Sequence, residues 1–61
     1  MTEGIAREAE RKQITGVGRT AWWALEKKGL APARVRLMRN RVGWMRSELL
    51  AWAAARPRVD I

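Results

Sequence analysis

The feature that most constrains the fold is a pair of glycines, Gly16 and Gly29, with a helix-forming segment between them. Gly16 can end a preceding helix and turn the chain, because glycine adopts positive φ at little steric cost. Residues 19–28 contain no glycine or proline and suit a second helix. Lys27 and Lys28 would lie in its last turn, where cations oppose the negative end of the helix dipole. Short helices joined by a tight glycine turn predict a helix-turn-helix.

The segment before the turn predicts a first helix over residues 5–13, which is rich in helix-forming residues. Glu8 and Lys12 are four residues apart in the favourable order and are expected to form an ion pair on its surface. Its apolar face is thin, so this helix depends on docking to the rest of the chain. Ile14 and Val17, on either side of the turn, are expected to be buried.

Tryptophans have to supply most of the core, because the chain has four of them and no Phe or Tyr. A chain of 61 residues buries only about 60% of its unfolded surface, so each large apolar side chain counts. Trp22, Trp44 and Trp52 each lie on an apolar stripe and are predicted core residues. Trp23 points about 100° away from Trp22 on the helix, so the two are not expected to be equally buried.

Residues 34–44 predict a β-hairpin. Apolar residues such as Val35 and Leu37 alternate with basic ones on both sides of Arg39 and Asn40, which gives the two-residue period of strands. Asn40 suits the turn, because asparagine tolerates left-handed backbone conformations. Such a short hairpin is weak alone and needs helices beside it, so we expect it to form a wing.

Ser47 predicts the N-cap of a last helix, Glu48 suits the positive end of that helix, and Pro57 stops it. The predicted fold class is therefore mainly α with a small β-hairpin, a winged helix-turn-helix in the order helix-helix-hairpin-helix. We expect a single domain over residues 1–61, with an ordered core at about 5–56 and a frayed tail over 57–61.

The charge balance narrows the function. Thirteen Lys and Arg against six Asp and Glu give a net charge of +7, which favours an anionic partner: DNA, RNA or a membrane surface. A membrane binder is disfavoured, because it needs one long amphipathic helix. No apolar run approaches the roughly 20 residues of a membrane span, and the N-terminus is polar, unlike a signal peptide. We therefore expect a cytoplasmic, nucleoid-associated protein with no membrane partner.

Enzymatic function is not expected. The chain has no cysteine and no histidine, which removes disulfides, thiolate metal sites and the usual general base at neutral pH. So small a core leaves no room for a catalytic pocket. We expect no cofactor, no metal and no small-molecule ligand. The alternative to nucleic-acid binding is a small basic protein-interaction module that binds an acidic partner.

Four ordered stretches of the chain resemble a known family: Ile14-Thr15-Gly16-Val17-x-Arg19-Thr20, Leu25-x-x-x-Gly29-x-x-Pro32, Arg41-Val42-Gly43-Trp44 and Ser47-Glu48-x-x-x-Trp52. Together they cover most of residues 5–56 and resemble the AlpA family, small phage-type regulators related to excisionases and to the DNA-binding heads of MerR-like proteins. Gly18 departs from the family pattern, where Ser is usual, and so does Ala31, where an aromatic residue is common.

The resemblance implies a winged helix-turn-helix that binds double-stranded DNA near a prophage or integrative element. Such a protein either activates integrase or excisionase genes or bends DNA as a recombination directionality factor. Integrase and further copies of the chain on adjacent DNA sites are candidate partners. Several copies are expected because one small reading head has a small interface with DNA.

The candidate DNA-binding residues are Arg19, Thr20, Trp23, Lys27, Arg36, Arg39, Asn40 and Arg41. Arg19 and Thr20 lie in the first turn of the second helix, which meets base edges in helix-turn-helix proteins. The basic hairpin tip either enters the minor groove or is a solvated turn. Trp23 stands where the resemblance suggests a Tyr near a phosphate, so its indole either contacts the DNA backbone or packs in the core.

Overall fold

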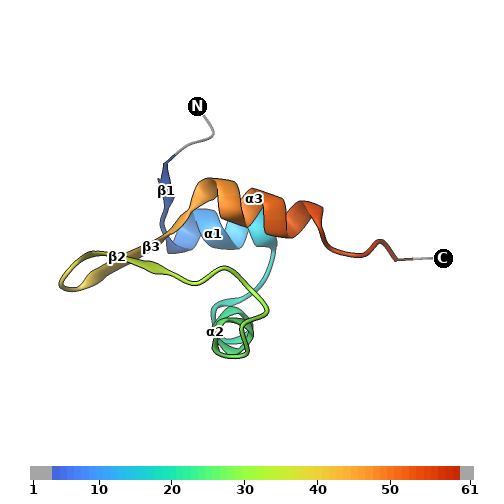
Figure 1. Ribbon diagram of the computed structural model, residues 1–61, viewed down its shortest axis with the longest axis horizontal. Helices are drawn as coiled ribbons and strands as arrows, with labels where there is room; N and C mark the ends of the chain where they lie inside the picture. The colour runs from blue at the N-terminus through green and yellow to red at the C-terminus, as the bar shows by residue number, and fades with distance from the viewer. Residues whose placement is uncertain (1–3, 60–61) are drawn as a thin grey trace.

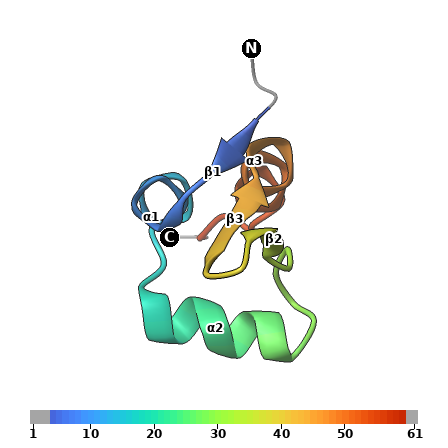
Figure 2. The ribbon, with the colours of Figure 1, turned by 90° about the vertical axis from the view of Figure 1, so that its left-hand side faces the viewer.

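The computed structural model describes residues 4–59, which form three helices and a three-stranded antiparallel sheet (Figure 1). In chain order the elements are β1 (Ile5–Ala6), α1 (Glu8–Thr15), α2 (Arg19–Lys27), β2 (Val35–Met38), β3 (Arg41–Met45) and α3 (Arg46–Ala54). Helices α1 and α3 lie side by side, and α2 runs across below them (Figure 2). The hairpin of β2 and β3 projects to one side (Figure 1). The winged helix-turn-helix fold predicted from the sequence is thus confirmed, with one added strand.

The first helix begins later than the sequence predicts, because residues 5 and 6 form a strand. Ile5 pairs with Met45 and Ala6 with Trp44, so β1 becomes an edge strand of a sheet in the order β1-β3-β2. This pairing buries Ala6 completely. A strand of two residues has no periodicity of its own, so only the distant partner strand determines its conformation. At its other end α1 continues through Thr15, beyond the predicted residue 13.

Gly43 lies buried at the centre of the sheet and explains how β1 fits there. A side chain at this position would collide with the side chain of Ile5 and crowd the carbonyl of Ala6. Glycine in a strand often marks such a close approach of a neighbouring backbone. The absence of a side chain at Gly43 therefore lets β1 pair closely beside β3.

The turn between α1 and α2 forms as expected. Gly16 has a φ of 71°, in the left-handed region, and its N–H bonds to the carbonyl of Lys12 as the C-cap of α1. Gly18 is the extended N-cap of α2 and offers no side-chain hydrogen bond. Gly29, with a φ of 72°, turns the chain after α2. Gly16 and Gly29 therefore turn the chain before and after α2.

Ser47 does not cap the last helix, contrary to the sequence prediction. Helix α3 starts at Arg46 with Met45 as N-cap and without a side-chain cap. The N–H of Arg46 instead donates to the carbonyl of Gly4 at 2.9 Å, so β3 passes directly into the helix while still paired with the chain before β1. Glu48 lies in the first turn as predicted.

The core is small and lies between the helices and the sheet. Its buried apolar residues are Ala6, Trp22, Trp44 and Leu49. Of the three predicted core tryptophans, Trp22 and Trp44 are almost fully buried. Trp52 is only partly buried; its ring meets Trp22 edge to face at 4.9 Å. Ile14 and Val17 are also partly buried against this cluster.

Two sets of terminal residues, 1–3 and 60–61, lie outside the described residues. The polar N-terminal segment and the end of the expected frayed tail fall partly on them. Residues 57–59 follow α3 without helix or strand structure (Figure 1). None of the helices within residues 4–59 is long and apolar enough to cross a membrane.

Candidate nucleic-acid interface

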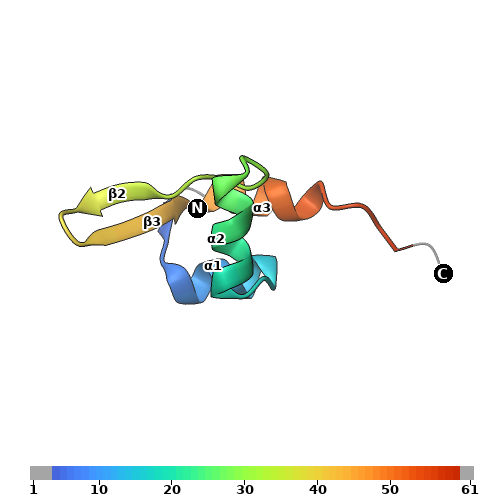
Figure 3. The ribbon, with the colours of Figure 1, turned by 90° about the horizontal axis from the view of Figure 1, so that it is seen from below.

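Helix α2 has one face in the core and the opposite face in solvent. Trp22 is buried and Leu25 packs partly against the core. On the outer side Thr20, Trp23 and Lys27 are exposed, at the spacing of three to four residues that places side chains on one helix face. Figure 3, seen from below, shows α2 in front of the other helices and the hairpin extending sideways from it. The outer face of α2 is therefore open to a partner.

The first turn of α2 presents Arg19 and Thr20 to solvent. Both residues are exposed, and Arg19 forms no hydrogen bond or ion pair within residues 4–59. The carbonyl of Gly18 already accepts the first helical bond, from the N–H of Trp22 at 2.9 Å. The side chains at this helix start are thus positioned by the helix and free to meet another molecule.

Trp23 is not a core residue. Its side chain is 52% exposed, and the Nζ of Lys27 lies 4.2 Å from the ring centroid, a cation–π contact one turn along the helix. Of the two interpretations open from the sequence, core packing is wrong. The outer face of α2 carries an exposed indole with an ammonium group above it.

The hairpin tip is basic and exposed. Arg39, Asn40 and Arg41 all face solvent, and Arg36 donates a hydrogen bond from Nη1 to the carbonyl of Arg39 at 2.9 Å. Arg36 therefore braces the turn. Leu37 is the extra residue of a β-bulge, because Arg36 pairs with Val42 while Met38 pairs with Arg41.

No residue other than glycine within the described chain has positive φ, so Asn40 does not use the left-handed conformation that the sequence suggested for it. The bulge changes the local twist and the position of the turn. The sequence prediction of the hairpin itself, with its turn at Arg39 and Asn40, is correct.

A cleft joins the start of α2 to the hairpin. Its lining includes Arg19 from α2 and Asn40 from the hairpin tip, two of the predicted site residues, together with Arg7 and Arg34. Arg7 lies between β1 and α1, and Arg34 directly precedes β2. The structure thus brings Arg19 and Asn40 together. Thr20, Trp23 and Lys27 form a separate apolar hollow farther along the outer face of α2.

Arg7 and Arg34 were not predicted as site residues. Neither lies on a helix or strand, so no periodicity in the sequence places them on the same side as α2. The sequence placed Arg7 inside the predicted first helix, residues 5–13, and Arg34 at the start of the predicted hairpin, residues 34–44, so their only signal for this site is a positive charge. That signal is weak in a chain with thirteen Lys and Arg.

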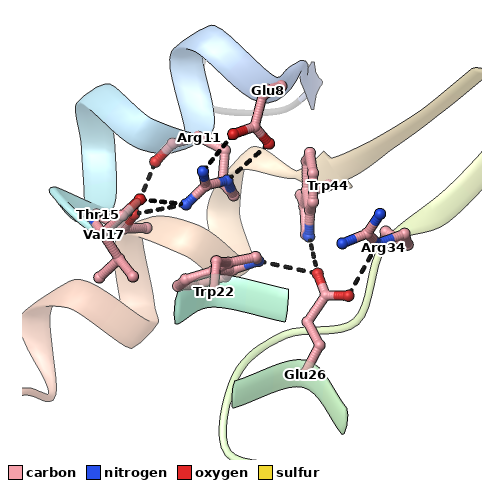
Figure 4. A network of polar contacts seen from close by, with 8 residues as sticks. All are labelled: Glu8, Arg11, Thr15, Val17, Trp22, Glu26, Arg34 and Trp44. Atoms are coloured by element: carbon pink, nitrogen blue, oxygen red, sulfur yellow. Dashed lines mark hydrogen bonds and ion pairs between the residues drawn. The ribbon is translucent and has the colours of Figure 1, made fainter. Parts of the chain in front are cut away.

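The interface rests on a buried arginine that the sequence prediction also missed. Arg11 of α1 is fully buried. Its guanidinium donates to both carboxylate oxygens of Glu8, to the hydroxyl of Thr15 at 3.3 Å and to the carbonyl of Val17 at 2.8 Å (Figure 4). Glu8 thus pairs with Arg11 and not with Lys12 as predicted. The guanidinium can satisfy several acceptors at once, whereas an ammonium is a single compact charge.

The hydrogen bond from Arg11 holds the pKa of Glu8 below its ordinary value of 4.5, against an opposing effect of desolvation. Through the carbonyl of Val17, Arg11 also fixes the turn between α1 and α2. One side chain of α1 therefore helps to hold the start of α2 in place.

Glu26 makes the second anchor of α2. One of its oxygens accepts hydrogen bonds from the indole N–H groups of Trp22, at 2.9 Å, and Trp44, at 2.7 Å (Figure 4). The other accepts from Nε of Arg34 at 2.9 Å. This carboxylate ties α2 to β3 and to the segment before β2. Every buried side-chain nitrogen and oxygen within residues 4–59 has a hydrogen-bond partner.

Helices α1 and α3 are linked by an ion pair of two hydrogen bonds. Arg46 donates to the two oxygens of Glu10 at 2.6 and 2.8 Å, and also to the carbonyl of Ile5 at 3.3 Å. Together with the contacts of Arg11 and Glu26, this ion pair connects the elements that lie behind α2. No group of acidic side chains suited to a metal ion lies within the described residues.

These features define the class: a small basic winged helix-turn-helix protein with an exposed second helix. A family model described as prophage CP4-57 regulatory protein (AlpA) matches residues 4–57. The chain therefore belongs to the AlpA family of phage regulators. It is a phage-type regulatory protein, and AlpA regulators bind DNA, which supports DNA as its partner. Comparisons with curated proteins and with solved structures found no match.

Proposed function

We propose that this protein binds double-stranded DNA sequence-specifically, with α2 in the major groove and the hairpin against the minor groove or the backbone. One observation carries the proposal. The inner face of α2 is anchored by Trp22 and Glu26, while its outer face, with Arg19 and Thr20 at the start, has no protein covering it within residues 4–59. A reading helix has to be held rigidly and left open on one side.

Each element has its own proposed contact. Arg19 and Thr20 meet base edges, where an arginine fork matches the O6 and N7 atoms of guanine. Trp23 and Lys27 lie farther along the outer face of α2 and contact the sugar-phosphate backbone. Arg39 and Arg41 of the hairpin tip reach the minor groove or its phosphates, and Arg36 holds that tip in shape.

The test starts with selection of a preferred site from random duplex DNA, followed by fluorescence anisotropy on the selected site and on random DNA. Arg19→Ala should cost about 1–3 kcal/mol on the selected site while hardly changing binding to random DNA. Arg58→Ala is the matched control, because it removes the same charge from the exposed segment after α3. Equal losses on both DNAs would make Arg19 a phosphate contact only.

The biological role is a prophage or integrative-element regulator, acting on transcription or as an excisionase-type recombination directionality factor. Both roles use the same contacts, but only the second requires a bent duplex. A circular-permutation assay on the selected site separates them, since bending changes the migration of the complex with the position of the site. Integrase is a proposed partner of the bending role, and copies of the chain on adjacent sites are proposed for either.

The competing proposal is a module that binds an acidic protein. It predicts no preference among DNA sequences, so failure of the selection to enrich any site would favour it. The net charge of +7 suits both partners. The exposed outer face of α2 favours DNA, because its charged residues follow one helix face that fits a groove.

A further inference from the structure

The cleft between α2 and the hairpin gathers arginines from three separate parts of the chain. Arg7 follows β1, Arg19 begins α2, and Arg34 precedes β2. The cleft has a volume of about 230 Å³, room for several waters at about 30 Å³ each. It is therefore large enough for a phosphate group. Asn40 lies on its lining as a further hydrogen-bond donor.

Arg7 and Arg34 are each held in place by a hydrogen bond from Nε, which leaves their Nη1 and Nη2 atoms available. Arg34 donates from Nε to Glu26 at 2.9 Å, and its guanidinium carbon lies 5.2 Å from the ring centroid of Trp44. Arg7 donates from Nε to the carbonyl of Val42 at 3.1 Å. Neither donates a hydrogen bond from Nη1 or Nη2 within residues 4–59. Their orientation is thus fixed before any ligand arrives.

The cleft is electropositive. Among residues 4–59 its only acidic lining residue is Glu8, and that carboxylate is already engaged by Arg11 through two hydrogen bonds. The charges of Arg19 and Arg34 both contribute to holding the pKa of Glu8 low, so these guanidinium groups lie close enough to act on the cleft. An anion that enters meets free guanidinium donors and no free carboxylate.

We propose that this cleft binds one phosphodiester group of the DNA backbone, held between the Nη atoms of Arg7 and Arg34. Guanidinium groups bind phosphate oxygens with paired, charge-assisted hydrogen bonds. The site lies between α2 and the hairpin, so the phosphate it holds is the one where the strand passes from the helix to the wing. It would set the register of α2 without reading sequence. This inference rests on the proposed function.

The first test measures binding of Arg7→Gln and Arg34→Gln to the selected and to random duplexes at several salt concentrations. Each variant should bind about tenfold more weakly on both DNAs, and each should reduce the slope of log K against log salt by up to about 0.9. Arg58→Gln, with the same charge change outside the cleft, should leave affinity close to that of the parent. Unchanged affinity and slope in both cleft variants would overturn the proposal.

Folding has to be separated from binding, because Arg34 also bonds Glu26. Thermal melts of both variants should stay near the parent value, since Glu26 keeps its two indole donors. Arg34→Lys supplies a second measurement: it keeps the charge but loses the fork, so it should restore the salt slope and only part of the affinity. If lysine restored the affinity in full, the positive charge alone would explain binding, and the proposed paired hydrogen bonds from Arg34 to the phosphate would be overturned.

A neutral methylphosphonate placed at successive positions of the selected duplex locates the phosphate. One position should weaken binding of the parent about tenfold and should hardly affect Arg34→Gln, because the two changes remove the same contact. Additive losses at every position would overturn the proposal. A parent without sequence preference whose cleft variants still lose binding would refute the proposed function but not this site.

Free phosphate is the other source of the same chemistry. Titration with inorganic phosphate, followed by the indole N–H resonance of Trp44, should give no saturation in the range where the duplex saturates, because the duplex supplies the remaining contacts. Saturation by inorganic phosphate as tight as by duplex would mean a site for the free anion and overturn the assignment to DNA.

Discussion

The two faces of α2 place the same kinds of residue in opposite surroundings. Trp22 is 1% exposed and donates its indole N–H to Glu26, while its neighbour Trp23 is 52% exposed. Each ring has a cation nearby, but Arg11 beside Trp22 comes from another helix, whereas Lys27 above Trp23 comes from α2 itself. Aromatic and cationic residues on the inner face join elements together. On the outer face the same types stay available for a partner.

The arginines divide in the same way. Arg11 is fully buried with all its contacts inside the protein, and Arg39 and Arg41 lie exposed at the hairpin tip. The net charge therefore overstates the positive charge that is available to DNA, because part of that charge stabilises the fold. Arg34 stands between the two groups, with one nitrogen bound to Glu26 and the others facing the cleft.

The largest effect should come from replacing the neighbouring tryptophans in turn. Trp22→Ala should lower the free energy of unfolding by about 3–5 kcal/mol, because it empties the core and removes a donor from Glu26. That loss is comparable with the whole stability of a small domain. Trp23→Ala should change it by no more than about 0.5 kcal/mol and should weaken DNA binding. Urea denaturation followed by circular dichroism measures the stability of both variants, and fluorescence anisotropy measures the DNA binding of Trp23→Ala.

The comparison of the two faces fails if both variants lose similar stability. A stable Trp22→Ala protein would mean that the core closes over the missing ring. A Trp23→Ala protein with parental stability and parental DNA affinity would leave the outer indole without a role.

Arg11→Met is the next largest change. Methionine keeps much of the volume but removes the hydrogen bonds to Glu8, Thr15 and Val17, so unfolding should become easier by about 1–3 kcal/mol. Lys12→Met is the matched control on the same helix, where the side chain is exposed. Buried ion pairs are often replaced by apolar residues without loss. A parental urea midpoint for Arg11→Met would therefore show that packing alone holds α2.

Much of this arrangement could be predicted from sequence because local rules govern it. Gly16 and Gly29 mark turns by their conformational freedom, and the two-residue period marks the hairpin. The strand at Ile5 and Ala6 could not be predicted, since its conformation depends on pairing with β3, far along the chain. The prediction that Ser47 caps α3 was wrong for a related reason: the carbonyl of Gly4, before β1, accepts a hydrogen bond from the N–H of Arg46.

The candidate site was predicted where charge and periodicity coincide, on α2 and at the hairpin tip. Arg7 and Arg34 were not predicted as site residues, because they lie in irregular segments that only the folded chain brings together. The burial of Arg11 was not predicted either, although Arg11 lies in a regular helix. A charged residue on a helix with a thin apolar face predicts a solvated position, and only the surrounding acceptors reverse that expectation.

A smaller effect, on DNA binding, is expected from the exposed arginines of the hairpin tip. Replacing Arg39 and Arg41 together with Ala should weaken DNA binding and leave the thermal melt unchanged, because both side chains are exposed. Each lost phosphate contact should reduce the slope of log K against log salt by about 0.9. If these residues enter the minor groove, the loss should be larger on sites with A·T-rich flanks, where that groove is narrow. An unchanged slope would mean that the hairpin tip faces solvent in the complex.

The smallest effect concerns the ion pair between α1 and α3, which is partly exposed but belongs to the support of α2. The hydrogen bond from Arg46 lowers the pKa of Glu10 below its ordinary value of 4.5, and the same bond raises the pKa of Arg46. A carboxyl with a lowered pKa in the folded state stabilises the protein above its ordinary pKa. That stabilisation disappears as the pH falls through the folded pKa.

Glu10→Gln should therefore be slightly less stable than the parent at neutral pH, and the difference should shrink as the pH falls below 4.5. Thermal melts between about pH 3 and pH 7 measure this convergence. Glu8 also has a lowered pKa, so the variant should keep part of the parent's acid sensitivity. A gap between Glu10→Gln and the parent that stays constant with pH would mean that the carboxylate charge does not stabilise the contact between α1 and α3.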